Sequence, residues 1–393
     1  MDPVLNPYRP GAGRRPPVLA GRGPLLDSFT VVQRRAAEYG EGDRGWVLNG
    51  LRGVGKTVLL NEMQSQASAR GWITAKVEAT AGTPLSTALS HALVSSMRTA
   101  TGRHPVPKLK RLLGVFKAFS LKFNPVTGGL ALGADVDLVS GVADSGRFAD
   151  DLSALFETLG ETSRELGIGT LILVDELQEA TKDELTAVNT AVHHLGQDPE
   201  PLPVTFVGAG LPSLPAQLAD ATSYAERLYD YRPVGLLSEE AAEAALVGPS
   251  LQLDVPWNDG AVARAMDIAR GYPYFLQAVG KHVWDAARGP SIEIDDVEIG
   301  GELARREVDE GLYRSRWERA TPAQKELLRA LGDIGGEEPA VIGELVSATG
   351  KRRVSDLSVA RNELIKKGLV YAPERGLLAF TVPGMSDFIA RQP

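Results

Sequence analysis

Short apolar runs alternate with longer amphipathic segments over residues 21–236. The runs have the length of buried strands, whereas the segments between them place apolar residues every three or four positions, which predicts helices. We predict strands at 44–49, 72–79, 169–176, 203–208 and, more briefly, 230–234. Strands that alternate with helices normally pair in parallel. The sequence therefore predicts an α/β core with a parallel sheet that is covered by helices on both faces.

The pattern changes at residue 237, after which helices follow one another without strands between them. Helices that begin at 238, 258 and 273 predict a small helical lid over 237–290, and a connecting helix is expected at 291–320. The remaining stretch, 321–393, contains three short helices and then two strands, at 368–371 and 376–381. This order is typical of a winged helix-turn-helix, and its third helix, 354–367, would be the recognition helix.

Two stretches do not fit these patterns. Residues 1–20 are rich in proline and arginine, which predicts an extended arm and not a domain. Residues 102–147 contain several lysines, and apolar runs at 118–123 and 130–136 flank an Asn-Pro-Val-Thr-Gly-Gly turn. We predict a β-hairpin insertion here. It could be a surface elaboration or an arm that contacts a partner or a nucleic acid.

The segment 50–57 fits the pattern G-x-x-x-x-G-K-[ST] of the phosphate-binding P-loop. A predicted strand precedes it and a predicted helix follows it, as this motif requires. Its glycines let successive backbone N–H groups turn toward one anion, and the helix N-terminus adds about half a positive charge. We expect Lys56 to reach the phosphates of ATP and Thr57 to hold Mg²⁺. The predicted nucleotide-binding residues are Gly50, Leu51, Arg52, Gly53, Val54, Gly55, Lys56, Thr57 and Val58.

The apolar strand at 169–176 ends in two acids, Asp175 and Glu176. Ligands of open α/β sheets bind outside the carboxyl ends of the strands, where the P-loop also lies. We predict that Asp175 binds Mg²⁺ together with Thr57, and that Glu176 and Lys56 are the catalytic residues. Paired acids at a strand end can also be merely solvated. The buried run before them and the P-loop upstream favour the functional interpretation.

Composition excludes several kinds of chemistry. The 393 residues include no cysteine, which excludes disulfides, thiol catalysis and Cys-ligated zinc, and the five histidines form no ligand pattern. No apolar run of about 18 residues predicts a membrane helix, and the proline-rich start does not resemble a signal peptide. A cytoplasmic protein without membrane contact is therefore expected. The net charge is −8, but basic residues outnumber acidic ones beyond Tyr313, so any nucleic-acid contact is expected there.

The order of these motifs resembles the additional-strand, catalytic-glutamate class of P-loop ATPases. More closely, the chain resembles AAA+/STAND-type ATPases related to origin-recognition proteins, and most of all a bacterial group of ATP-binding proteins of unclear role. The matching pieces are 19–22, 50–57, 174–178, 207–212, 224–228 and 271–277.

The resemblance implies roles for further residues. Arg22 would line the adenine pocket, and Gly271-Tyr272-Pro273 would be a lid motif that senses the base, with Pro273 against the nucleotide. A helix end followed by a Pro-initiated helix explains the same residues without a ligand. Arg227 or Arg232 would be a sensor, or an arginine finger for a neighbouring subunit, although a surface ion pair is an alternative. The fourth strand ends in Gly-Ala-Gly where many AAA+ proteins have Asn, Ser or Thr, and the lid lacks the usual arginine. Both departures favour a slow switch.

Two functions remain open. In the first, an ATP-driven switch binds duplex DNA through phosphate contacts from Arg352, Arg353, Arg361 and Lys366. In the second, ATP or ADP controls signalling or assembly with a homo-oligomer or partner protein, and the winged helix is a protein contact or an autoinhibitory module without DNA binding. A metabolic kinase is disfavoured because no acceptor-substrate domain is apparent.

Overall fold

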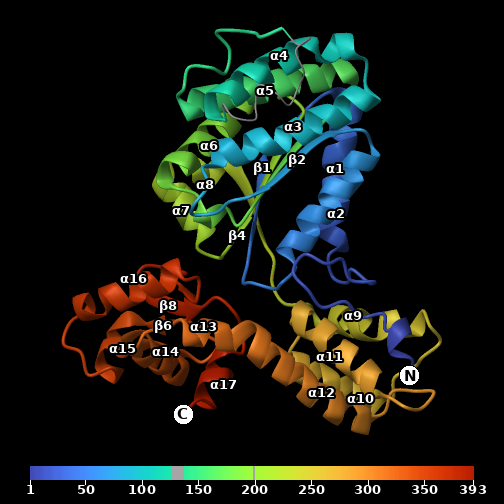
Figure 1. Ribbon diagram of the computed structural model, residues 1–393, viewed down its shortest axis with the longest axis vertical. Coiled ribbons are helices and arrows are strands. Elements are labelled where there is room, and N and C mark those ends of the chain that lie inside the picture. Colours follow the sequence, from blue (N-terminus) through green and yellow to red (C-terminus); the bar gives the residue numbers. More distant parts are fainter. Residues whose placement is uncertain (125–136, 198–199) are drawn as a thin grey trace. The chain divides into compact units, whose positions relative to one another are not determined.

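The computed structural model describes residues 1–124, 137–197 and 200–393 (Figure 1). The chain forms two compact units. The sheet unit comprises Pro24–Asn49 and Lys56–Pro233, and the C-terminal unit comprises Met1–Gly23, Gly50–Gly55 and Val234–Pro393. The P-loop segment is therefore shared, because its six N-terminal residues belong to one unit and Lys56 and Thr57 to the other.

The sheet unit contains five parallel strands in the order β2-β3-β4-β1-β5. Their bounds are Gly45–Asn49 (β1), Ile73–Glu78 (β2), Thr170–Asp175 (β3), Val204–Gly210 (β4) and Tyr229–Pro233 (β5). The predicted strands and their parallel pairing are confirmed. Every residue of β3 and of β4 is buried. This agrees with their apolar sequences, which are typical of strands covered on both faces.

Two hydrogen bonds show that helices cover both faces of the sheet. Thr57, on α2 (Lys56–Ala69), donates to Asp175, and Ser163, on α5 (Phe148–Leu166), pairs with Thr170. Asp175 and Thr170 are an odd number of positions apart on β3, and alternate side chains of a strand point to opposite faces. Consequently, α2 and α5 lie on opposite faces. The sheet unit also contains α1 (Gly23–Tyr39), α3 (Leu85–Arg103), α4 (Val106–Phe123), α6 (Lys182–Leu195), α7 (Leu214–Ala221) and α8 (Ala225–Leu228).

The prediction of a β-hairpin at 102–147 is wrong for the part that the structure describes. Val106–Phe123 is a helix, α4, which packs on α3 and α5. Its large buried side chains recur at helical spacing, at Leu109, Leu112, Leu113, Phe116 and Phe119, and a proline lies in its first turn, where a missing N–H costs nothing. The run 118–123 therefore forms the last helical turns, in which 118–120 are buried, and not a strand. The second expected strand, 130–136, lies outside the described residues.

The C-terminal unit begins with three helices, α9 (Glu239–Leu251), α10 (Asp259–Ala269) and α11 (Pro273–Ala286), which we call the lid helices after their prediction. The connecting helix α12 (Ile294–Val308) continues through a π-helical turn at Asp309–Arg314 into α13 (Ser315–Glu318). The final segment contains α14 (Pro322–Gly335), β6 (Ala340–Val341), α15 (Ile342–Ala348), α16 (Ser358–Lys366), β7 (Val370–Tyr371), β8 (Leu377–Phe380) and α17 (Met385–Ala390).

The helices and the hairpin that were expected at 321–393 are present, and the structure adds β6 and α17. Strands β6, β8 and β7 form an antiparallel sheet in that order. A capping box at Thr321 and Gln324 starts α14, as its Thr-Pro-Ala-Gln sequence indicates. A single cluster of buried apolar residues runs from the lid helices to α17. It holds the lid helices, the connecting helix and the final segment together as one unit.

The N-terminal arm packs against the lid helices. The Tyr8 side chain is 4% exposed, and its hydroxyl donates to the Leu246 carbonyl at 2.5 Å. Its ring lies against Gly280, where a Cβ atom would come within 2.4 Å of it. Trp284 Nε1 donates to the Asp2 carbonyl at 2.9 Å. The arm has little regular secondary structure, as its prolines predict. Its conformation is fixed by its contacts with the lid helices.

We expect Tyr8→Ala to lower the free energy of unfolding by about 3 kcal/mol, because it empties a buried aromatic site. Urea denaturation of the full chain measures the change. Tyr39→Ala is the matched control, since Tyr39 is 72% exposed and its loss should cost less than about 0.5 kcal/mol. Equal stability of the two variants would contradict the packing of the arm.

Candidate active site

In the sheet unit, the start of α2 and the end of β3 bring together three of the predicted residues. Lys56 is the first residue of α2, and β1, which precedes the P-loop, is separated from β3 by β4. The Thr57 hydroxyl donates to Asp175 Oδ2 at 2.7 Å. Lys56 and Asp175 are 6% and 4% exposed. The hydroxyl and carboxylate oxygens form a hard donor pair of the kind that Mg²⁺ prefers.

Glu176 follows Asp175 in a left-handed backbone conformation, with φ of +50°. Its backbone N–H donates to Asp175 Oδ1 at 3.0 Å, and this bond links the two neighbouring acids. Gln178, on the 3₁₀ turn Leu177–Glu179, donates from Nε2 to Glu176 Oε2 at 2.5 Å. The sequence reasoning assigned no role to Gln178. Its place two residues after the predicted base was the available signal.

Lys76 is a second residue that the sequence reasoning missed. It lies on β2, on the sheet face toward α2, and its ammonium donates to Asn61 Oδ1 on that helix. Burial lowers the pKa of Lys76, and the nearby carboxylates of Asp175 and Glu78 oppose the shift. Glu78 is the register partner of Asp175, and Lys76 lies two residues before Glu78, on the same face of β2. The alternation along β2 therefore brings the Lys76 ammonium close to the acidic end of β3.

In the C-terminal unit, the glycines of the P-loop have conformations that other residues avoid. Gly53 and Gly55 have φ of +80° and +99°. At Gly50 a Cβ atom would lie 2.1 Å from the Val234 carbonyl oxygen. The residues 50–55 thus form a close backbone turn, as the motif predicts.

Arg22 contacts the P-loop backbone. Its guanidinium donates to the carbonyls of Val54, at 2.9 Å, and Gly235, at 2.7 Å. Burial lowers the pKa of Arg22. Arg22 therefore lies beside the P-loop, where its Nη2 donates to two backbone carbonyls. Its place in an adenine pocket stays a prediction.

The lid and the final segment also contact the P-loop. Tyr272 is 2% exposed, and its hydroxyl oxygen would lie 2.5 Å from a Cβ on Gly53. Pro273 begins α11 directly after it. The Arg52 N–H donates to the Thr381 carbonyl at 3.1 Å, just beyond β8. The predicted lid motif therefore reaches the P-loop through the tyrosine that precedes its proline.

Arg227 does not lie with Lys56 and Glu176 in the sheet unit. It is in α8, directly before β5, and Tyr229 is the register partner of Gly45 at the start of β1. The amino ends of parallel strands form the edge opposite to the carboxyl ends. Arg227 therefore lies far from Lys56 of the same chain and cannot sense a nucleotide that this lysine binds. Arg232 stacks on Trp46, with its Cζ 3.6 Å from the ring centroid, and pairs with Asp230.

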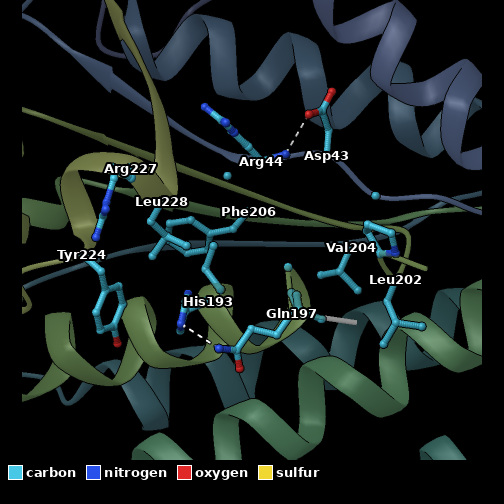
Figure 2. Close-up of a pocket in the computed structure, with 16 residues that line it drawn as sticks. Asp43, Arg44, His193, Gln197, Leu202, Val204, Phe206, Tyr224, Arg227 and Leu228 are labelled. Atoms are coloured by element: carbon cyan, nitrogen blue, oxygen red, sulfur yellow. Dashed lines mark hydrogen bonds between the residues drawn. The ribbon is translucent and has the colours of Figure 1, made fainter. Parts of the chain in front are cut away.

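Arg227 lines a hollow of about 450 Å³ at the amino edge of the sheet (Figure 2). Apolar residues such as Phe206 form its wall, and the His193 ring stacks on Tyr224 with centroids 4.5 Å apart. Figure 2 shows Arg227 close to Tyr224 at one end of the hollow. A role of Arg227 toward a neighbouring subunit stays a prediction.

The four residues predicted to contact DNA lie in one part of the final segment. Arg352 and Arg353 are exposed before the turn Val354–Leu357, Arg361 is half-buried on α16, and Lys366 is exposed and pairs with Glu363 at 2.8 Å. Lys367 is different, because its ammonium donates to the Arg319 carbonyl and to Gln324 Oε1, both at 2.7 Å. It anchors α16 to α14.

Residues 18–207 match the family model of the AAA ATPase domain. This part of the chain is therefore similar to AAA ATPase domains. Residues 310–389 match a family described as a domain of unknown function. None of the curated proteins matches the sequence.

Two of the similar solved structures share the fold of this chain over nearly its whole length. One is a Walker-type ATPase of Pyrococcus abyssi, with a TM-score of 0.61, 16% identity and coverage of 98% of this chain and 99% of the other. The second is the Aeropyrum pernix ORC2 protein with ADPNP and ADP, with a TM-score of 0.54, 15% identity and coverage of 97% and 96%. The predicted P-loop ATPase fold is confirmed. Among the described residues, no helix is long and apolar enough to cross a membrane.

We expect Gly53→Ala to lower the free energy of unfolding by about 2 kcal/mol, because the new methyl group meets the Tyr272 hydroxyl and the backbone has a left-handed φ. Thermal and urea denaturation measure the change. Gly343→Ala, at an open helical position, is the control and should be neutral. The close approach of Tyr272 would be refuted if Gly53→Ala were equally neutral.

Proposed function

We propose that this chain binds Mg-ATP and hydrolyses it slowly as a molecular switch. The observation that carries the proposal is the Thr57–Asp175 hydrogen bond, which holds the predicted magnesium ligands together at the start of the P-loop helix. The peptide bond between Gly55 and Lys56 joins this pair to the glycine turn at 50–55. Phosphates would bind at the backbone N–H groups and at Lys56.

Thr57 and Asp175 are the residues that would hold Mg²⁺, which supplies positive charge to the phosphates when it is bound. Glu176 is the proposed base that orients the attacking water. No hydroxyl or amide side chain comes from the end of β4, where the sequence is Gly208-Ala209-Gly210. This departure supports slow turnover.

The contacts between the final segment and the P-loop support the idea that the nucleotide state acts on the final segment. The Arg52 N–H bonds to the Thr381 carbonyl, and Tyr272 lies against Gly53. A conformational change of the glycine turn would therefore alter contacts with both the lid and the final segment. We propose that the nucleotide state controls DNA binding through Arg352, Arg353, Arg361 and Lys366.

A protein contact is the second candidate for the same segment. Val354 is 52% exposed and Val359 is 77% exposed beside the basic residues. Exposed valines of this kind suit a protein surface better than a phosphate backbone. In this alternative the nucleotide state controls assembly with a partner protein or a second copy of the chain.

We expect Glu176→Gln to keep ATP affinity within about twofold and to lower turnover at least about 100-fold, because the amide cannot accept the proton of the water. Nucleotide titration and phosphate release measure the two effects. Glu243→Gln, at an exposed lid position, is the control. Lys56→Ala should lose ATP binding itself. Unaltered turnover of Glu176→Gln would remove its assignment as the base.

For DNA binding, we expect the affinity for a duplex to fall roughly 100-fold between 50 and 200 mM salt if about four phosphates are contacted. Fluorescence anisotropy at several salt concentrations gives the slope. The double variant Arg352→Ala/Arg353→Ala should reduce that slope by roughly two, whereas Arg34→Ala on α1 should not. If the chain does not bind duplex DNA at low salt, the DNA-binding function is excluded and the protein contact remains as the proposed function of this segment.

A further inference from the structure

The side chain of Gln178 bridges Glu176 to the end of β4. Its Nε2 donates to Glu176 Oε2 at 2.5 Å, and its Oε1 accepts from the N–H of Leu211 at 3.1 Å. A longer contact, 3.4 Å, runs from Nε2 to Glu179 Oε1. The carboxylate of the proposed base is thus connected through one amide group to the backbone N–H of the residue that follows β4.

The hydrogen-bonding partners determine how this amide is oriented. A backbone N–H can only donate, so the amide oxygen must face Leu211. An ionised carboxylate can only accept, so the amide nitrogen must face Glu176. Rotation of the amide by half a turn would place oxygen against oxygen at Glu176 and N–H against N–H at Leu211. Gln178 therefore has one orientation that satisfies both partners, and in that orientation it donates to Glu176.

The small residues at the end of β4 make room for the bridge. A Cβ atom on Gly210 would come within 2.5 Å of Gln178 Oε1. A Cβ atom on Gly208 would come within 2.6 Å of Leu177, on the same turn. The Gly-Ala-Gly sequence, which lacks a polar side chain of its own, is therefore the surface on which this turn lies.

Glu176 also needs an external restraint. Its left-handed backbone conformation costs about 1 kcal/mol for a residue with a side chain. Such strain persists only where surrounding contacts hold it, and the bond to Gln178 is one of these contacts. Without the amide, the carboxylate would have more rotamers and the turn could relax.

We propose that Gln178 is a positioning residue for Glu176, taking the place of the polar side chain that β4 lacks. The amide aims the carboxylate at the attacking water and ties its position to the end of β4. This role rests on the proposed hydrolysis of ATP.

The test compares Gln178→Ala with Gly210→Ala, which should displace the amide through its added methyl group while both Gln178 and Glu176 remain. Each variant should lower kcat at least about tenfold and leave KM and ATP affinity within about twofold, because positioning acts on the chemical step. The double variant should be no slower than Gln178→Ala alone, since both changes break one bridge. The controls are Gln252→Ala, which is exposed, and Gly82→Ala, where a Cβ meets open space.

An unchanged or raised kcat in Gln178→Ala would overturn the proposal, as would losses that multiply in the double variant. A loss of ATP affinity equal to the loss of kcat would also overturn it, because it would indicate a structural effect. A wild-type chain that binds ATP without any turnover would remove the proposed hydrolysis and this role together. Turnover by the wild type that Gln178→Ala leaves intact would remove this role alone.

Discussion

The hydrogen bond between Thr57 and Asp175 is the interaction on which the arrangement of the site depends. It forms because β1 and β3 are parallel and end at the same edge of the sheet, with β4 between them. The helix that starts at Lys56 then runs back over the face from which Asp175 projects. A slip of β3 by one residue would turn Asp175 to the opposite face, so the site depends on the register of the buried strands.

A second constraint is the close packing of the glycine turn in the C-terminal unit. Arg22, Tyr272 and Thr381 come from the N-terminal segment, the lid helices and the final segment, and each contacts the backbone of residues 52–54. Backbone that is bonded in this way has few conformations available. A ligand that changes the turn must change at least one of these contacts, which is the physical basis of the switch that we propose.

The charged residues divide into those that support the fold and those that are available to a partner. Lys367 and Arg232 looked equivalent to their neighbours in sequence, but Lys367 anchors α16 and Arg232 covers Trp46. Arg352 and Arg353 remain exposed. Arg227 lies at the edge of the sheet opposite to Lys56, so a nucleotide contact of Arg227 would have to be with another subunit. Net charge alone could not make these distinctions.

The parallel strands, most helices, the glycine turn and the two acids at the end of β3 could be predicted from the sequence alone. These features depend on local periodicity, on turn residues and on motif spacing, all of which are read within about 15 residues. The helix at 106–123 could not be predicted in this way, because a short apolar run is compatible with either a helix or a strand until its packing partners α3 and α5 are known. The same holds for Tyr8 against Gly280 and for Gln178 against Gly210, where residues far apart in sequence meet. Such contacts depend on the arrangement of whole elements, which no local pattern encodes.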